Sequence, residues 1–235
     1  MIMSYKYYQV TLLRKPKNLE LNYNRFEGPN MFITFEGIEG SGKSTQAKLL
    51  KEFLELKGYT VSLTREPGWG ALGKLIRRML LEERELELDP IAELCLFCAD
   101  RAQHVKDFII PKLRDGQIVI CDRFYDSTIV YQGYARRLDL TLVKRLAKAS
   151  ALDVHPKLTV LLNIPVKKGL SRLDQRDDRT KMDDEPLDFH ERVRQGYMLI
   201  AKDEPARIRI LNAAKDLSVL QDEIRSLVLS HLNSK

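Results

Sequence analysis

One stretch of eight residues constrains the fold of this chain more than any other. Gly37–Ser44 has the spacing Gly-x-x-x-x-Gly-Lys-Ser, follows a β-branched and aromatic run at Met31–Glu36, and opens an amphipathic helical pattern at Lys43–Lys57. Glycines allow backbone N–H groups to curl around an anion, and the helix N-terminus adds the positive end of its dipole. The pattern predicts a phosphate-binding P-loop; the alternative is an ordinary strand-turn-helix connection rich in small residues.

The side chains of this loop suit a nucleotide. Lys43 would bridge the β and γ phosphates, and the Ser44 hydroxyl would ligate Mg²⁺. The residues expected around the ATP phosphates are Gly37, Ile38, Glu39, Gly40, Ser41, Gly42, Lys43, Ser44 and Thr45.

Strand-like and helical patterns alternate along the rest of the chain. The strand-like runs are Met31–Glu36, Thr60–Thr64, Gln117–Cys121, Leu158–Asn163 and Arg207–Leu211. Such alternation predicts an α/β protein with the P-loop NTPase fold, in which a five-stranded, mostly parallel sheet is flanked by helices on both faces. Ligands then bind at the carboxyl ends of the strands. Two segments break the rhythm: a glycine-punctuated loop, Gly68–Gly73, and a charged stretch, Arg172–Glu185.

A second phosphate-side motif follows the third strand-like run. Asp122 and Arg123 come directly after Gln117–Cys121, at the carboxyl end of the expected strand. Asp122 would hold Mg²⁺ directly or through water, and Arg123 would clamp a phosphate oxygen. The alternative is a surface ion pair at a strand end.

Composition narrows the class of protein. The 39 Lys and Arg exceed the 33 Asp and Glu by six, but residues 1–30 hold five basic and two acidic residues, so half of the excess lies there. The remaining +3 does not indicate a nucleic-acid binder. The chain also lacks the roughly 20 consecutive apolar residues of a membrane span. Three cysteines, Cys95, Cys98 and Cys121, give no disulfide framework, which favours a reducing compartment, and they do not supply the four ligands of a zinc site. Without a membrane span or a continuous apolar signal core in the first thirty residues, a cytoplasmic location is expected.

Residues 31–235 resemble thymidylate kinases, which are P-loop nucleoside monophosphate kinases. The resemblance rests on motifs in the family's order: Phe35-Glu36-Gly37, Thr64-Arg65-Glu66-Pro67-Gly68, Asp122-Arg123-Phe124, Ser127-Thr128 and Tyr131-Gln132-Gly133. It implies one domain over residues 31–235 with a lid at about 171–185, phosphorylation of dTMP by ATP and Mg²⁺, and a homodimer. The leading residues 1–30 are read separately as an N-terminal extension: a disordered tail, the result of a misassigned start, or a targeting segment, against which the single serine, Ser4, argues.

The resemblance assigns a substrate contact to ten positions: Glu39, Glu66, Arg77, Phe97, Arg101, Arg123, Ser127, Thr128, Tyr131 and Gln132. Glu39 would reach the 3′-hydroxyl of the sugar, and Tyr131 would crowd the ribose C2′ position and so favour deoxyribonucleotides. Glu66 would lie near the acceptor phosphate, which Arg77 and Arg123 would hold.

Three of these residues would recognise the base: Phe97 and Arg101 on one face of a helix, and Gln132 through its side-chain amide. Phe97 and Arg101 lie four residues apart, so Phe97 can stack on thymine while Arg101 donates to a base carbonyl. Gln132 would satisfy the remaining imide edge. Ser127 and Thr128 have an alternative reason for their position, as N-cap residues of the next helix.

The resemblance also implies where the catalytic cations lie. Family members without an arginine in the P-loop use arginines of the lid, which makes Arg176 the expected catalyst beside Lys43 and Arg123, with Arg172 and Arg179 as neighbours that could substitute. A solvated charged face is the alternative for the lid. Two positions depart from the usual pattern: Trp69 interrupts a Gly-Gly pair, and Phe124 stands where tyrosine is usual.

Two other functions remain open at this stage. A kinase for another nucleoside monophosphate or for a deoxynucleoside would use the same P-loop and Asp122-Arg123 pair. A nucleotide-dependent switch ATPase would also carry a P-loop, although the sequence has no Asn-Lys-x-Asp motif of the guanine-nucleotide switches.

Overall fold

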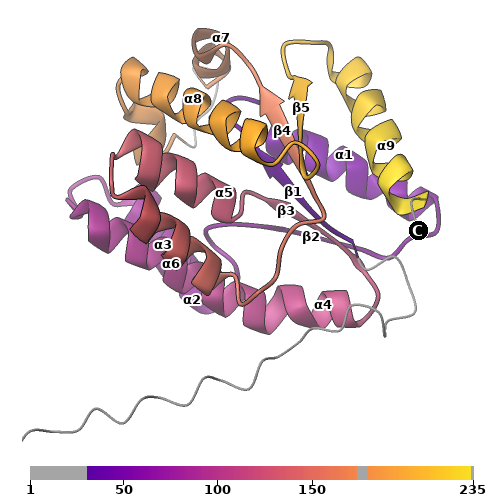
Figure 1. The fold of residues 1–235 in the computed structure, drawn as a ribbon, viewed down its shortest axis with the longest axis horizontal. Coiled ribbons are helices and arrows are strands. Elements are labelled where there is room, and N and C mark those ends of the chain that lie inside the picture. Colours follow the sequence, from indigo (N-terminus) through magenta and orange to yellow (C-terminus); the bar gives the residue numbers. More distant parts are fainter. Residues whose placement is uncertain (1–30, 174–178, 234–235) are drawn as a thin grey trace, which may run out of the picture.

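The computed structural model describes residues 31–173 and 179–233, and their centre is one parallel sheet (Figure 1). The strands are β1 (Phe32–Glu36), β2 (Val61–Arg65), β3 (Ile118–Asp122), β4 (Leu158–Asn163) and β5 (Ile208–Asn212). Their order is β2-β3-β1-β4-β5, and all four pairings are parallel. The predicted five-stranded sheet is confirmed, with every strand end within one residue of its expected position.

Helices of several kinds connect these strands. The α-helices are α1 (Lys43–Leu56), α2 (Gly70–Arg77), α3 (Pro90–His104), α4 (Ile110–Arg114), α5 (Tyr125–Thr128), α6 (Leu140–Ser150), α7 (Val166–Ser171), α8 (Leu187–Asp203) and α9 (Leu217–Asn233). Wider π-helical turns form η2 (Arg78–Glu82), η3 (Val105–Ile109) and η4 (Ile129–Ala135), and η5 (Lys181–Asp184) is a 3₁₀ turn.

The helices cover the sheet on both faces. α1 and α9 pack beside each other on one face, and α3, α5 and α8 lie on the opposite face (Figure 1). With both faces covered, β1 is buried along its whole length, as expected for a strand at the centre of a parallel sheet. Among the described residues, no helix combines the length and apolar character that a membrane crossing needs.

The first crossover helix forms as its sequence predicts. Ala47, Leu50 and Leu54 are buried on one face of α1, and Gly58 beyond its end adopts a left-handed φ of 86°. The expected loop at Gly68–Gly73 is wrong in part, because α2 already begins at Gly70. Gly73 is needed for close packing: a Cβ there would lie 2.6 Å from Asp100 Oδ1.

The sheet order creates the place for a ligand. α1 follows β1 on one face, whereas the chain after β3 enters α5 on the other (Figure 1). A ligand crevice is expected where the connections diverge in this way, at the carboxyl ends of the two neighbouring strands. Phe35 pairs with Asp122 at this point, and the Arg123 N–H donates to the Phe35 carbonyl at 3.0 Å. The two phosphate-side motifs therefore meet.

Candidate active site

A pocket of about 580 Å³ opens at this crevice. Nearly all of the sequence-predicted site residues line it: Glu39 through Thr45, Glu66, Arg77, Phe97, Arg101, Asp122, Arg123, Ser127, Thr128, Tyr131 and Gln132. Gly37 and Ile38 lie beside a smaller hollow, next to β4. Arg176 falls outside the described residues.

Lys43 is held inside the turn that precedes it. Its Nζ donates to the carbonyls of Gly37 at 3.0 Å and Ile38 at 2.8 Å, and the side chain is buried. Burial, together with the positive charge of Arg123, lowers the pKa of Lys43 to about 8. An anion placed in the turn would reverse this shift, because it favours the charged form of the ammonium group.

The two expected metal ligands are in direct contact. Ser44 at the start of α1 donates its hydroxyl hydrogen bond to Asp122 Oδ2 at the end of β3. A hydroxyl and a carboxylate supply the hard oxygen atoms that Mg²⁺ prefers. This donor set fits the ion that the sequence predicts.

Arg123 organises the wall between the turn and the rest of the pocket. Its backbone has a left-handed φ of 70°, which few residues other than glycine adopt. The guanidinium donates to the Gly37 carbonyl at 3.1 Å and to Glu39 Oε1 at 2.9 Å, and it lies 4.9 Å from the centroid of the Tyr131 ring. The Tyr131 hydroxyl also donates to Glu39. Three residues that the sequence predicts for the site thus form one cluster.

The charge of Glu39 is stabilised by this cluster. Burial alone would raise the pKa of its carboxyl, but the positive charge of Arg123, a hydrogen bond from His190 and the charge of Lys43 lower it to about 2. Glu39 is therefore an anionic acceptor beside the phosphate-binding turn.

Sequence reasoning missed two residues of α8. His190 Nδ1 lies 3.2 Å from Glu39 Oε2, and the Tyr197 hydroxyl donates to Glu36 Oε2 at 2.8 Å and accepts from Arg123 Nη1 at 3.3 Å. Both lie far along the chain from the turn, so no local spacing connects them to it. The signal available in the sequence is two polar rings on the buried face of an amphipathic helix.

The opposite wall of the pocket is supplied by α3. Arg101 is 1% exposed; its Nε donates to Glu66 Oε2 at 2.8 Å and its Nη2 to Thr128 Oγ1 at 2.9 Å. Its buried Nη1 has no hydrogen-bond partner among the described residues. Leaving a charged donor unpaired is costly, so this atom indicates that a ligand acceptor belongs there. Phe97, one turn earlier, lines the same pocket and is partly buried.

Tyr131 and Gln132 enter the pocket from the π-helical turn η4. Such wide turns are frequent at functional sites, because they displace side chains from a regular helix. Gln132 is buried and donates from Nε2 to Glu93 Oε1 at 2.8 Å. The expected N-cap role of Ser127 and Thr128 is wrong: both lie inside α5, whose N-cap is Phe124. Ser127 donates to Glu36 at 2.6 Å instead.

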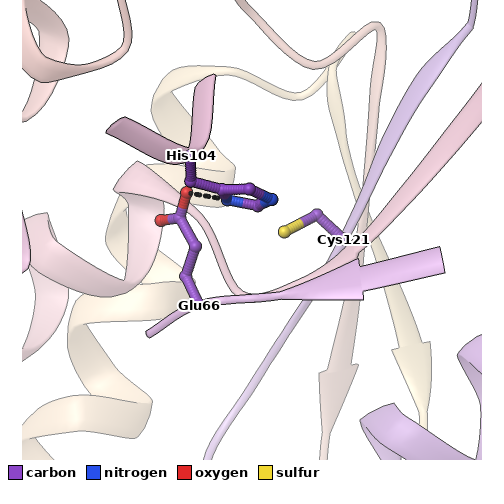
Figure 2. Close-up of side chains that lie close together, drawn as sticks. All are labelled: Glu66, His104 and Cys121. Atoms are coloured by element: carbon purple, nitrogen blue, oxygen red, sulfur yellow. Dashed lines mark hydrogen bonds and ion pairs between the residues drawn. The ribbon is translucent and has the colours of Figure 1, made fainter. Parts of the chain in front are cut away.

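A second network fixes Glu66 at the end of β2. Figure 2 shows the Glu66 carboxylate facing His104 of α3, with Cys121 of β3 close to the imidazole. Their ligand atoms lie within 4.8 Å of one another, as in a metal site. His104 is, however, already bonded on both sides, to Glu66 at 2.9 Å and to Thr64 Oγ1 at 2.8 Å, and burial raises the pKa of the Cys121 thiol. We interpret the cluster as a support for Glu66, and through it for Arg101.

The described lid arginines are bound to carbonyls and carboxylates. Arg172 donates to the Gly40 carbonyl of the phosphate-binding turn at 3.2 Å, and also to the Ala213 carbonyl at 3.2 Å. Arg179 pairs with Asp184 at 3.2 Å. Arg172 thus contacts the turn directly.

Comparison with known proteins identifies the family. The family model for thymidylate kinase matches residues 35–224, which is most of the chain. The chain belongs to the thymidylate kinase family.

Relatives of this family match over nearly their whole length. A thymidylate kinase from Desulfovibrio desulfuricans is 46% identical over 212 residues, covering 87% of this chain and 98% of the relative. One from a Synechococcus species is 48% identical over 183 residues, covering 78% and 86%. A crystal structure of thymidylate kinase from Ehrlichia chaffeensis matches with a TM-score of 0.68 and 37% identity, covering 84% of this chain and 98% of that one.

The two departures from the usual thymidylate kinase pattern have a structural account. Trp69 stacks on His104 with ring centroids 5.5 Å apart and lies 5.2 Å from Phe108, so the indole packs on the support of Glu66. Phe124 is fully buried against Phe32 at 4.9 Å, edge to face. The Arg101 guanidinium carbon lies 5.4 Å from the centroid of the same ring, so Phe124 also packs against a base-side residue of the pocket.

Proposed function

We propose that this member of the thymidylate kinase family transfers the γ-phosphoryl group of ATP to the 5′-phosphate of dTMP, giving dTDP and ADP. The observation that carries the proposal is Arg101, which lines the same pocket as the phosphate-binding turn and whose buried Nη1 has no partner among the described residues. A phosphate cradle and an unpaired base-side donor in one pocket fit a nucleotide acceptor better than a switch ATPase.

Phosphoryl transfer needs alignment and charge neutralisation. Lys43 would turn from the carbonyls it contacts to the transferring phosphates, and Arg123 would hold the acceptor phosphate with Arg77. Mg²⁺, held by Ser44 and Asp122, would neutralise phosphate charge when bound. Lid closure would exclude water, so that ATP is not hydrolysed.

The sugar and the catalytic lid arginine complete the proposal. Glu39 is an ionised acceptor that suits the 3′-hydroxyl of a deoxyribose, and the Tyr131 ring beside it would clash with a 2′-hydroxyl. Arg176 remains the proposed lid cation. Arg172 is the alternative, because it already contacts the turn at Gly40.

The test is a coupled assay of the full chain with Mg-ATP over a panel of nucleosides and nucleoside monophosphates. We expect dTMP to be the best acceptor by orders of magnitude. Lys43→Ala should lower kcat by roughly 10²-fold or more, because a transition-state cation is lost. Lys48→Ala, an exposed lysine on the same helix, is the matched control and should retain wild-type turnover. A Lys43→Ala protein with full activity would refute the mechanism.

The oligomeric state and the location of the enzyme are part of the same proposal. A homodimer is expected from the family resemblance, and light scattering on the purified chain tests it. Cys95, Cys98 and Cys121 are all free thiols, which supports a reducing, cytoplasmic location.

A further inference from the structure

Gln132 is held in place by a buried acidic residue that has no assigned role. Glu93, in the first turn of α3, is 7% exposed and accepts a hydrogen bond from Gln132 Nε2 at 2.8 Å. Gln132 is 1% exposed and lines the pocket. The side-chain amide of Gln132 is therefore shared between Glu93 and any bound base.

Glu93 is itself fixed by an arginine. Arg136 Nε donates to Glu93 Oε1 at 3.3 Å and Arg136 Nη2 to Glu93 Oε2 at 3.2 Å, which is the fork that a guanidinium makes with a carboxylate. The same Nη2 lies 2.6 Å from Glu185 Oε1 at the end of the lid segment. The Glu93 carboxylate cannot rotate without breaking its two hydrogen bonds from Arg136.

The chemistry of the pair decides which way the Gln132 amide points. A glutamine amide has one acceptor oxygen and two N–H donors, whereas a carboxylate only accepts. Glu93 must therefore face Nε2, and Oε1 is the atom left for the pocket. This orientation follows from donor and acceptor types, so it does not depend on telling oxygen from nitrogen in an amide.

The pocket consequently presents one donor and one acceptor to a base. Both residues line the pocket: Arg101, whose Nη1 has no partner among the described residues, would supply the donor, and Gln132, whose Nε2 is bound to Glu93, would supply Oε1 as the acceptor. Thymine offers a matching carbonyl at O4 and an N–H at N3. Cytosine has an amino group at the first position and an acceptor nitrogen at the second, so both contacts would be mismatched.

We propose that Glu93 is a specificity-positioning residue: it locks the amide of Gln132 so that the pocket accepts thymine and rejects cytosine. The inference rests on the proposed function and names the source of its base selectivity. Glu93 acts through Gln132, with Arg136 as its anchor.

The decisive variant is Glu93→Gln in the full chain, assayed with Mg-ATP and either dTMP or dCMP. An amide side chain at position 93 can accept as well as donate, so the Gln132 amide is free to turn and present Nε2 to cytosine N3. The ratio of kcat/KM for dTMP to that for dCMP should fall roughly tenfold, because one buried polar contact no longer discriminates. The KM for dTMP should rise while the KM for ATP stays unchanged.

A rescue variant separates orientation from general damage. The double variant Glu93→Gln with Gln132→Glu exchanges the amide and the carboxylate between the two positions. The amide at position 93 then donates to the carboxylate at position 132, whose second oxygen again offers the pocket an acceptor. The dTMP preference should return.

A second single variant keeps the proposal testable even if Glu93→Gln does not fold. Arg136→Gln loosens the fork that anchors Glu93 but leaves the carboxylate in place. Arg136→Gln should also lower the ratio of kcat/KM for dTMP to that for dCMP, but by a smaller factor than Glu93→Gln.

The controls distinguish the two proposals. Glu52→Gln removes an exposed carboxylate from α1 and should leave the ratio unchanged. Wild-type protein that does not phosphorylate dTMP would contradict the proposed function. If the wild type is active but the ratio is unchanged in Glu93→Gln and Arg136→Gln, with both acceptors losing activity alike, Glu93 is only structural and the inference fails.

Discussion

At the scale of single residues, the site holds two arginines in unfavourable arrangements, one in its backbone conformation and one in its hydrogen bonding. Arg123 has a left-handed backbone, and Arg101 has a buried N–H without a partner among the described residues. A glycine at position 123 would relax the backbone, but it would lose the guanidinium that joins Gly37 to Glu39. Both features lie where the ligand contacts are expected.

The lowered pKa of Lys43 predicts a pH dependence of ATP binding. Phosphate charge should raise this pKa from about 8, so that binding takes up a proton at higher pH. Affinity should be constant below pH 8 and fall above it, with a limiting slope of about tenfold per pH unit. Calorimetric titration with ATP from roughly pH 7.5 to roughly pH 9.5 measures this slope. Lys43→Arg, which does not titrate in this range, should remove it; an identical slope in that variant would contradict the assignment.

At the scale of elements, α7 and the phosphate-binding turn touch through backbone. A Cβ on Gly40 would lie 1.9 Å from the Gly169 carbonyl oxygen, and a Cβ on Gly169 would lie 2.8 Å from the Glu39 carbonyl oxygen. No side chain fits between these two described segments. The lid segment begins directly after α7, so this contact ties the lid's root to the turn.

Gly169→Ala should therefore affect ATP more than dTMP. The helix must move away from the turn, at a cost of about 1–3 kcal/mol in the free energy of unfolding, and the KM for ATP should rise severalfold. Thermal unfolding and steady-state kinetics measure the two effects. Gly196→Ala on α8 is the matched control, since its Cβ would meet the Tyr134 side chain at 3.0 Å. It should cost stability without changing the KM for ATP; equal effects on KM would disprove the contact's role.

Local sequence signals predict most of the elements. The five strands and α1 carry continuous apolar runs or a clear helical period, and each is observed within a residue or two of its expected bounds. The loop expected at Gly68–Gly73 is wrong in part because glycine usually signals a loop, whereas Gly73 provides room for Asp100. Tertiary packing overrides propensity at this position.

The candidate site is predictable only where a motif is contiguous. Gly37–Ser44 and Asp122-Arg123 are identified from spacing, and the sheet register then brings Ser44 and Asp122 together. His190 and Glu93 contact predicted site residues from distant helices. Nothing in the order of residues reports such contacts, because they depend on how the helices pack.

At the scale of the whole molecule, a buried carboxyl joins three elements. Glu36 at the end of β1 accepts from the Phe124 N–H at 2.8 Å, from Ser127 at 2.6 Å and from Tyr197 at 2.8 Å. Burial, reinforced by the nearby charge of Asp126, raises the pKa of Glu36 to about 7. The sheet, α5 and α8 therefore share one titrating group.

This group should make stability depend on pH. The pKa of Glu36 is about 7 in the folded state and 4.5 ordinarily, so unfolding releases its proton between these values. The contribution of protonated Glu36 to the free energy of unfolding is full below pH 4.5 and is lost as the pH rises through about 7. Urea unfolding at roughly pH 5 and roughly pH 7.5 should show the wild type losing stability relative to Glu36→Gln, which cannot ionise. Parallel pH profiles for the two proteins would be inconsistent with a raised pKa.

Because β1 lies at the centre of the sheet, it can pair only after strands that are synthesised later. The strand that leads into the phosphate-binding turn leaves the ribosome before the other strands, but its hydrogen-bonded neighbours are β3 and β4, which begin at residues 118 and 158. Until then the five apolar-rich residues of β1 have no sheet to join. The first functional motif to be synthesised therefore cannot complete the pairing of its strand until residues 118–163 have emerged, and the nascent chain carries an unpaired strand until then.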